Sequence, residues 1–236
     1  MREAGRVVAL TKSLLADSVE PGITTEELDR IAEREIRKLG AQPSFKGLYG
    51  FPATICASLN EQVVHGIPSK REIQFGEILK IDVGAVVGGY HADSAFSLGV
   101  GKVTEEVQNL INDTRESLRL GVLHARDGSR VGDISEAVQN YGESHGYGVV
   151  RQWVGHGIGK DLHEEPQVPN YGVAGKGPLL REGMTIAIEP MLNMGTWETK
   201  ILEDDWTVVT ADGALSAHFE DTVLIGQNEA DVLTAI

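Results

Sequence analysis

The stretch that decides the fold is Gly76–Leu98, which reads GEILKIDVGAVVGGYHADSAFSL. Apolar and β-branched residues on both sides of Gly88-Gly89 are typical of an antiparallel hairpin. A turn centred on Val87-Gly88 would place Asp82 directly opposite Asp93, with Cβ atoms roughly 4.5–5.5 Å apart. Two carboxylates at that distance repel each other unless a cation lies between them. The hairpin therefore predicts a site for a divalent cation.

The same pattern recurs in a second, diverged copy. Gly183–Glu189 (GMTIAIE) repeats Gly76–Asp82 (GEILKID): a glycine, an apolar run and then an acid. His218–Glu220 follows the second copy as a returning segment, as His91–Asp93 follows the first. The two acids are 11 residues apart in the first copy and 31 apart in the second. We expect the longer excursion to hold an extra strand pair that turns at Asp212-Gly213.

Two such halves, about 1–125 and 126–236, predict a single domain spanning residues 1–236. Helical patterns cover 2–15, 24–38, 104–125 and 131–145, with a capping box formed by Thr24 and Glu27. We expect an α+β fold in which a pseudo-twofold, curved antiparallel sheet is covered by helices on its outer face. The four acids would then meet on the concave side of the sheet.

Composition limits the class of protein. A formal charge of −14, with no cluster of Lys and Arg, argues against direct nucleic-acid binding. The sequence has 41% hydrophobic residues, no apolar run long enough to span a bilayer and no leader-like start, so we expect no membrane association. Cys56 is the single cysteine, which excludes an internal disulfide framework and suits a reducing, cytoplasmic location.

Histidines are the next candidates, because a catalytic metal site often adds a neutral imidazole to its carboxylates. His156 is flanked by glycines in Gly155–Gly159, where a backbone could approach closely. His163 follows seven residues later, and His65 lies in a tight turn after an apolar strand. A lone acid at a strand end is usually a solvated residue. The metal prediction therefore depends on the joint pattern of four acids and one imidazole.

Taken together, the motifs resemble those of the type I methionine aminopeptidases, which have the pita-bread metallopeptidase fold. The resemblance extends to about Ile225, and its specificity lies in the order and spacing of the motifs. These are Met1–Gly5, Pro21–Asp29, Asn60–Pro68, the Asp82/Asp93 hairpin, Gly155–Gly159, Glu189-Pro190 and Ser216–Thr222.

The resemblance implies a ligand set for two divalent ions, which could be Mn, Fe, Co or Zn: Asp82, Asp93, His156, Glu189 and Glu220. Asp93 and Glu220 would bridge the ions. Asp82 would complete the shell of one ion, and His156 with Glu189 that of the other. The implied reaction is metal-dependent hydrolysis that removes the N-terminal methionine from peptides and nascent chains whose second residue is small.

Roles for other residues also follow from the resemblance. Glu189 is expected to be catalytic by accepting a proton from the attacking water, and His65 and His163 to be catalytic by hydrogen-bonding substrate and intermediate. The methionine side chain would enter a pocket of Phe51, Cys56, Leu162 and Trp206. Relatives often have phenylalanine, cysteine and histidine at three positions where this chain has Leu162, Val64 and Asp221.

Two alternatives remain open at this stage. One is an Xaa-Pro aminopeptidase or prolidase, which resembles this catalytic domain but normally carries an additional N-terminal domain. The other is a non-catalytic peptide-binding module of the same fold. For the enzyme we expect a monomer whose partners are N-terminal methionyl peptides and nascent chains.

Overall fold

The structure, a computed structural model, describes residues 1–235 of the chain. Its helices are α1 (Arg2–Ser18), α2 (Thr25–Lys38), α3 (Glu105–Leu123) and α4 (Val131–Ser144), with a short 3-10 turn at Leu48–Gly50. Its strands are β1 (Gln42–Pro43), β2 (Ile55–Leu59), β3 (Gln62–Val64), β4 (Ile78–Val87), β5 (Tyr90–Gly99), β6 (Gly148–Val149), β7 (Gly155–Gly157), β8 (Glu164–Val168), β9 (Thr185–Ile188), β10 (Met191–Asn193), β11 (Thr199–Ile201), β12 (Val208–Thr210), β13 (Ser216–His218), β14 (Asp221–Ile225) and β15 (Ala230–Val232).

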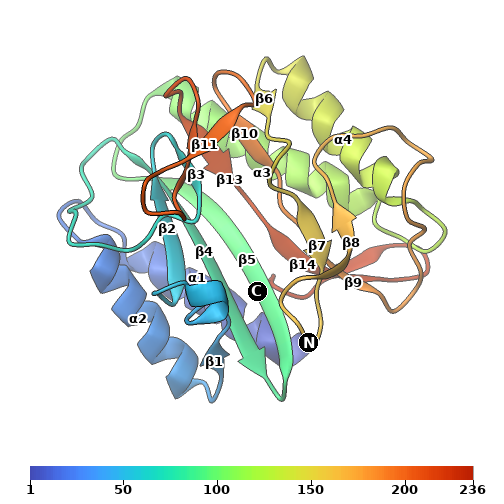
Figure 1. Ribbon diagram of the computed structural model, residues 1–236, viewed down its shortest axis with the longest axis horizontal. Coiled ribbons are helices and arrows are strands. Elements are labelled where there is room, and N and C mark those ends of the chain that lie inside the picture. Colours follow the sequence, from blue (N-terminus) through green and yellow to red (C-terminus); the bar gives the residue numbers. More distant parts are fainter. Residues whose placement is uncertain (236) are drawn as a thin grey trace.

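The strands lie at the centre of the molecule and the helices outside them (Figure 1). Helices α1 and α2 pack against the sheet of β1, β2, β4 and β5, whereas α3 and α4 pack against strands of the second half. All strand pairs within the sheets are antiparallel. This arrangement confirms the predicted α+β class with outer helices. No helix within residues 1–235 is long and apolar enough to cross a membrane.

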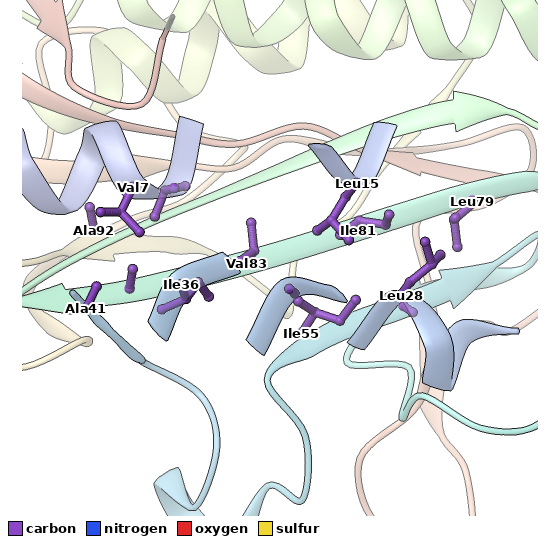
Figure 2. Packing of buried hydrophobic residues seen from close by; sticks show 14 of the residues in the cluster. Val7, Leu15, Leu28, Ile36, Ala41, Ile55, Leu79, Ile81, Val83 and Ala92 are labelled. Carbon is purple, nitrogen blue, oxygen red and sulfur yellow. The ribbon is translucent and has the colours of Figure 1, made fainter. Parts of the chain in front are cut away.

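Alternation along β4 separates the core from the site. Leu79, Ile81 and Val83 are fully buried and point toward the apolar faces of α1 and α2 (Figure 2). Because successive side chains of a strand point to opposite faces, Asp82 projects away from the helices. The same hydrophobic burial that fixes the strand against α1 and α2 therefore presents an acid on the other face.

The register of the β4–β5 hairpin differs from the prediction. Val87 pairs with Tyr90, so the turn consists of Gly88-Gly89, whose φ angles are 59° and 80°. A two-residue turn with positive φ at both positions favours glycine, which Val87 could not replace without strain. As a result Asp82 pairs with Ala95, and Asp93 pairs with Gly84. The two acids are diagonal neighbours on one face, and the prediction that they are directly opposed is wrong.

Direct opposition occurs instead in the second copy. Ile188 pairs with Asp221 and Met191 with His218, so one register continues across the gap between β9 and β10. That register sets Glu189 opposite Glu220. Pro190, which has no backbone N–H, lies in the gap, and its carbonyl accepts a hydrogen bond from Phe219 N at 3.2 Å. The interruption leaves both acids at strand ends.

The extra strand pair in the second copy exists, but it turns elsewhere. Strand β11 pairs with β12 through Thr199–Thr210 and Ile201–Val208, so the chain reverses over 202–207. The Asp212 side chain accepts hydrogen bonds from Thr196 N at 2.8 Å and Ala214 N at 3.0 Å. Asp212-Gly213 is therefore an anchored loop between β12 and β13, which belong to different sheets. The predicted turn position is wrong.

The helices follow the sequence pattern closely. At the start of α2, Thr24 Oγ1 accepts from Glu27 N at 3.2 Å, and Glu27 Oε2 accepts from Thr24 N at 2.9 Å. This confirms the predicted capping box. Helices α3 and α4 pack against each other and bury Leu110 and Ile134 in the core of the second half.

Candidate metal centre and substrate cavity

The candidate site lies at the seam where β5 of the first half meets β14 of the second. Ala95 and Glu220 exchange backbone hydrogen bonds, with N···O distances of 2.9 and 3.3 Å. Two residues before Ala95, Asp93 N donates to Thr222 Oγ1 at 3.1 Å. Thr222 Oγ1 in turn lies 2.8 Å from Asp93 O and 3.1 Å from Asp93 Oδ1. These bonds hold one acid from each half side by side.

Three side chains converge there. Asp93, His156 and Glu220 each offer one ligand atom, and these atoms all lie within 4.8 Å of one another. Asp93 and Glu220 are buried, at 2% and 3% exposure. Glu189 adjoins them, since its Oε1 lies 3.8 Å from His156 Nε2. His156 Nε2 is also 3.6 Å from Asp93 Oδ2, beyond hydrogen-bond distance.

Hydrogen bonding fixes which nitrogen of His156 faces the acids. Its Nδ1 lies 2.9 Å from Gly157 O, and a carbonyl only accepts, so Nδ1 carries the hydrogen in the neutral ring. Nε2 then presents a lone pair to the carboxylates, as a metal ligand must. A Cβ at Gly155 would lie 2.3 Å from Ala187 O, and one at Gly157 would lie 2.2 Å from Glu165 O. The flanking glycines thus permit the close packing that positions the ring.

Asp82 faces the same cavity from β4. Within residues 1–235 its buried Oδ1 has no hydrogen-bond partner. Burial and the neighbouring Asp93 raise the pKa of Asp82 well above its ordinary value. Burial, with Asp93 and Asp82 nearby, likewise raises the pKa values of Glu189 and Glu220 well above theirs. Burial raises the pKa of Asp93 as well.

These observations fit a bound cation. Four acids, two of them buried and two half-buried, face one space together with the Nε2 lone pair, and they cannot all be ionised unless positive charge compensates them. An orphaned carboxylate oxygen is a costly feature unless something binds it. Carboxylates with one imidazole are a donor set that suits divalent first-row metals. The five residues predicted as ligands are therefore brought together, and the donor chemistry fits such ions.

His65 and His163 line the same cavity. His65 follows β3 with φ of 60°, and its ring meets Trp153 edge-on at 5.1 Å between centroids. Burial lowers the pKa of His65 to about 4. His163 lies at the exposed mouth, its ring edge-on to His156 at 4.5 Å, and partial burial followed by the charge of His156 lowers its pKa. Both rings are consequently neutral at pH 7.

The predicted pocket residues form the apolar part of the cavity. Its volume is about 140 Å³. Phe51, Cys56 and Leu162 are buried, and the Phe51 and Trp206 rings meet edge-on with centroids 5.1 Å apart. The cavity thus has an apolar wall beside a polar floor of acids and imidazoles, an arrangement that can hold an apolar side chain next to a reacting polar group.

Some residues of the site were not predicted from the sequence. Tyr49 lines the cavity and its ring lies parallel to His163, with centroids 6.1 Å apart. Phe45 and Leu48 line it too. The signal available was the cluster of aromatic residues in a loop rich in Gly and Pro, which is unusual for a solvated loop. Thr222 belongs to the Ser216–Thr222 motif, but its hydrogen bonds with Asp93 were not predictable, because they depend on the seam between the halves.

Comparison with known proteins places these features in a family. Residues 1–227 match the model of metallopeptidase family M24. The chain is 53% identical to a methionine aminopeptidase of Clostridium perfringens over 236 residues, which cover 100% of this chain and 95% of that protein. It is 52% identical to methionine aminopeptidase 1 of Bacillus subtilis, again with 100% and 95% coverage.

Solved structures give the same picture. The methionine aminopeptidase of Thermotoga maritima matches with a TM-score of 0.98 and 43% identity, covering 100% of this chain and 95% of that one. That of Rickettsia prowazekii matches with a TM-score of 0.98, 38% identity, and 99% and 95% coverage. A prolidase of Pyrococcus furiosus matches with a TM-score of 0.82 but 23% identity, and this chain covers 63% of it. The last likeness shows the pita-bread fold alone.

Proposed function

This chain belongs to metallopeptidase family M24 and has the activity of a methionine aminopeptidase, and we propose that Asp82, Asp93, His156, Glu189 and Glu220 hold two divalent ions for that activity. The observation that carries the proposal is the buried convergence of Asp93, Glu220 and the His156 Nε2 lone pair within 4.8 Å. Asp93 and Glu220, one from each half, would lie between the ions, with Asp82 on one side and His156 with Glu189 on the other.

When bound, such ions supply polarisation of the scissile carbonyl and acidification of a water molecule. The chain's own residues would complete the reaction. Glu189 suits the transfer of a proton from water to the leaving amine, because its carboxyl group lies in the cavity beside the other proposed ligands. Its Oε1 lies 3.8 Å from His156 Nε2 and its Oε2 lies 4.0 Å from His218 Nε2, which restricts where the carboxyl group can turn.

His65 and His163 would act as neutral donors. Their lowered pKa values leave each ring uncharged at pH 7, so each has one N–H to donate to substrate oxygen. A donor aimed at the carbonyl strengthens as negative charge develops on that oxygen, which lowers the barrier. We assign the scissile carbonyl to His163, which lies at the mouth next to His156, and the rest of the substrate to His65, which lies beside Trp153.

The substrate proposed for this site is a peptide or nascent chain with an N-terminal methionine and a small second residue. The flexible, polarisable thioether would contact Phe51, Cys56, Leu162 and Trp206. Nascent chains start with methionine, so we also propose the cytoplasm as the place of action. The expected monomer, the absence of direct nucleic-acid binding and the division into halves near residue 125 stay predictions.

The test compares two peptides and two variants. Purified protein is incubated with Met-Ala-Ser and Met-Arg-Ser peptides in the presence of Mn(II), Co(II) or Fe(II), and free methionine is measured. We expect release from the first peptide only, and its loss by at least two orders of magnitude in Glu189→Gln. Glu182→Gln, an exposed acid before β9, serves as the matched control. No release under any metal, or equal release from both peptides, would refute the proposal.

The two alternatives are not favoured. An Xaa-Pro peptidase is supported here only by fold likeness, because the prolidase and X-Pro aminopeptidase structures share 19–24% identity with the chain. A non-catalytic peptide-binding module would have no need of five metal-binding positions, all of which carry suitable donors here.

A further inference from the structure

A polar cluster lies directly behind the two central acids. Lys12 of α1 reaches from the helix to the seam, where its Nζ is 2.6 Å from Ser94 Oγ and 3.5 Å from Asp221 Oδ1. The Lys12 and Asp221 side chains are 19% and 22% exposed, so water screens this ion pair only partly. On the other side, Thr234 Oγ1 lies 2.7 Å from the same Asp221 oxygen.

Two members of this cluster, Ser94 and Asp221, adjoin proposed ligands in the sequence. Ser94 follows Asp93, and Asp221 follows Glu220. The hydroxyl of Ser94 is 2.5 Å from the backbone oxygen of Glu220 and 3.2 Å from Asp221 Oδ1. Ser94 is fully buried. Ser94 lies on the same strand as Asp93, so a shift of its hydroxyl would move the backbone of Glu220 relative to Asp93.

The direction of the Ser94 hydroxyl depends on Lys12. A hydroxyl has one hydrogen to donate, while two acceptors, Glu220 O and Asp221 Oδ1, lie within reach. The ammonium of Lys12 donates to Ser94 Oγ and also supplies positive charge to Asp221, so Ser94 is free to donate to Glu220 O. Without the ammonium, the undercompensated carboxylate of Asp221 attracts the hydroxyl hydrogen away from Glu220 O.

We propose that Lys12 and Asp221 are a positioning pair that holds Ser94 on the Glu220 backbone and thereby sets the spacing of Asp93 and Glu220. The inference rests on the proposed role of these two acids as bridging ligands. It gives a function to the half-buried Asp221. The pair touches neither substrate nor the reacting atoms, and it acts through the two acids alone.

The test uses Co(II), whose visible absorption reports coordination geometry. Lys12→Met and Ser94→Ala both remove the proposed constraint, the second without changing any charge. Lys12→Arg keeps the positive charge and the donors. Arg6→Met is the matched control, because it removes one charge from the same helix at an exposed pair with Glu3. Co(II) affinity is measured by calorimetry and the spectrum by titration.

We expect Lys12→Met and Ser94→Ala to shift the Co(II) spectrum in the same way and to weaken Co(II) binding about 10-fold or more, in the range found when groups that orient metal ligands are removed. Lys12→Arg should keep a Co(II) spectrum and affinity close to those of wild type, and Arg6→Met should change neither the spectrum nor the affinity. Should Lys12→Met be too unstable to purify, Lys12→Gln removes the charge in its place, and Ser94→Ala tests the hydroxyl by itself.

The two ideas fail in different ways. Wild-type protein that binds no Co(II) overturns the proposed metal centre. Wild-type protein that binds Co(II), together with Lys12→Met and Ser94→Ala spectra and affinities equal to those of Arg6→Met, overturns the positioning pair alone. A Lys12→Met effect that Lys12→Arg does not reduce also overturns it, because the inference requires the cation.

Discussion

Replacement of Asp93 by asparagine should stabilise the metal-free protein. The variant keeps the oxygen that receives the Thr222 hydroxyl at 3.1 Å. It places a neutral amide, instead of a charged oxygen, at the position 3.6 Å from His156 Nε2. Two unit charges 4.8 Å apart, the limit of the Asp93–Glu220 ligand-atom separation, repel by about 3.5 kcal/mol at an effective dielectric of about 20. Proton uptake relieves part of this, so we expect a gain of about 1–3 kcal/mol at pH 8.

The gain should depend on pH in a defined direction. The carboxyl pKa values are raised in the folded, metal-free protein, so their contribution to stability is present at low pH and is lost as the pH rises through those values. The wild type therefore loses more stability than Asp93→Asn between pH 5.5 and pH 8. The lowered pKa values of His65, His163 and His218 do not depend on Asp93, so these three histidines affect both proteins alike and cancel in the difference.

The assay is urea unfolding of both proteins with a chelator present, at pH 5.5, 7 and 8. Asp17→Asn, which removes an exposed carboxylate from α1, is the control and should lie within about 0.5 kcal/mol of wild type. Added Mn(II) should stabilise wild type and not Asp93→Asn. A metal-free variant that is less stable than wild type at pH 8, or a difference that does not change with pH, would refute the electrostatic reasoning.

Three further outcomes are expected. Metal binding should release protons at pH 7, because carboxyl groups with raised pKa values must ionise, and calorimetry in two buffers of different ionisation enthalpy measures the number released. Trp206→Ala should raise KM for Met-Ala-Ser about 10-fold or more by opening the apolar wall, and an unchanged KM would remove Trp206 from the pocket. His65→Ala should lower kcat. Because the pKa of His65 is about 4, the variant and wild type should show the same ionisations between pH 6 and 7, and comparison of their pH–rate profiles tests this.

Much of the site was predictable because the chain repeats its pattern. A glycine, an apolar run and an acid, twice, locate Asp82 within β4 and Glu189 directly after β9, and the flanking glycines mark His156. Helix boundaries were predictable too, since caps such as Thr24 are local. These features depend on neighbours in sequence, which a single sequence displays.

The remaining features depend on contacts between segments that are distant in sequence. The register of the β4–β5 hairpin depends on whether the two turn residues are Val87-Gly88 or Gly88-Gly89. Gly88 and Gly89 form the turn because both adopt positive φ angles. Lys12 and Asp221 are 209 residues apart in the sequence, and no local pattern in α1 predicts their contact. The Tyr49 ring over His163 likewise depends on how a loop folds back over the cavity.

In the proposed metal centre, four carboxylates and one imidazole hold two ions, and Asp82 binds only one of them. Equilibrium dialysis against Mn(II), followed by metal analysis, tests this most directly, with wild type, Asp82→Asn and the Asp17→Asn control side by side. We expect two ions per chain for wild type and for the control, and one for Asp82→Asn. A wild type that binds fewer than two ions at saturation, or an Asp82→Asn variant that keeps both with unchanged affinity, would contradict it.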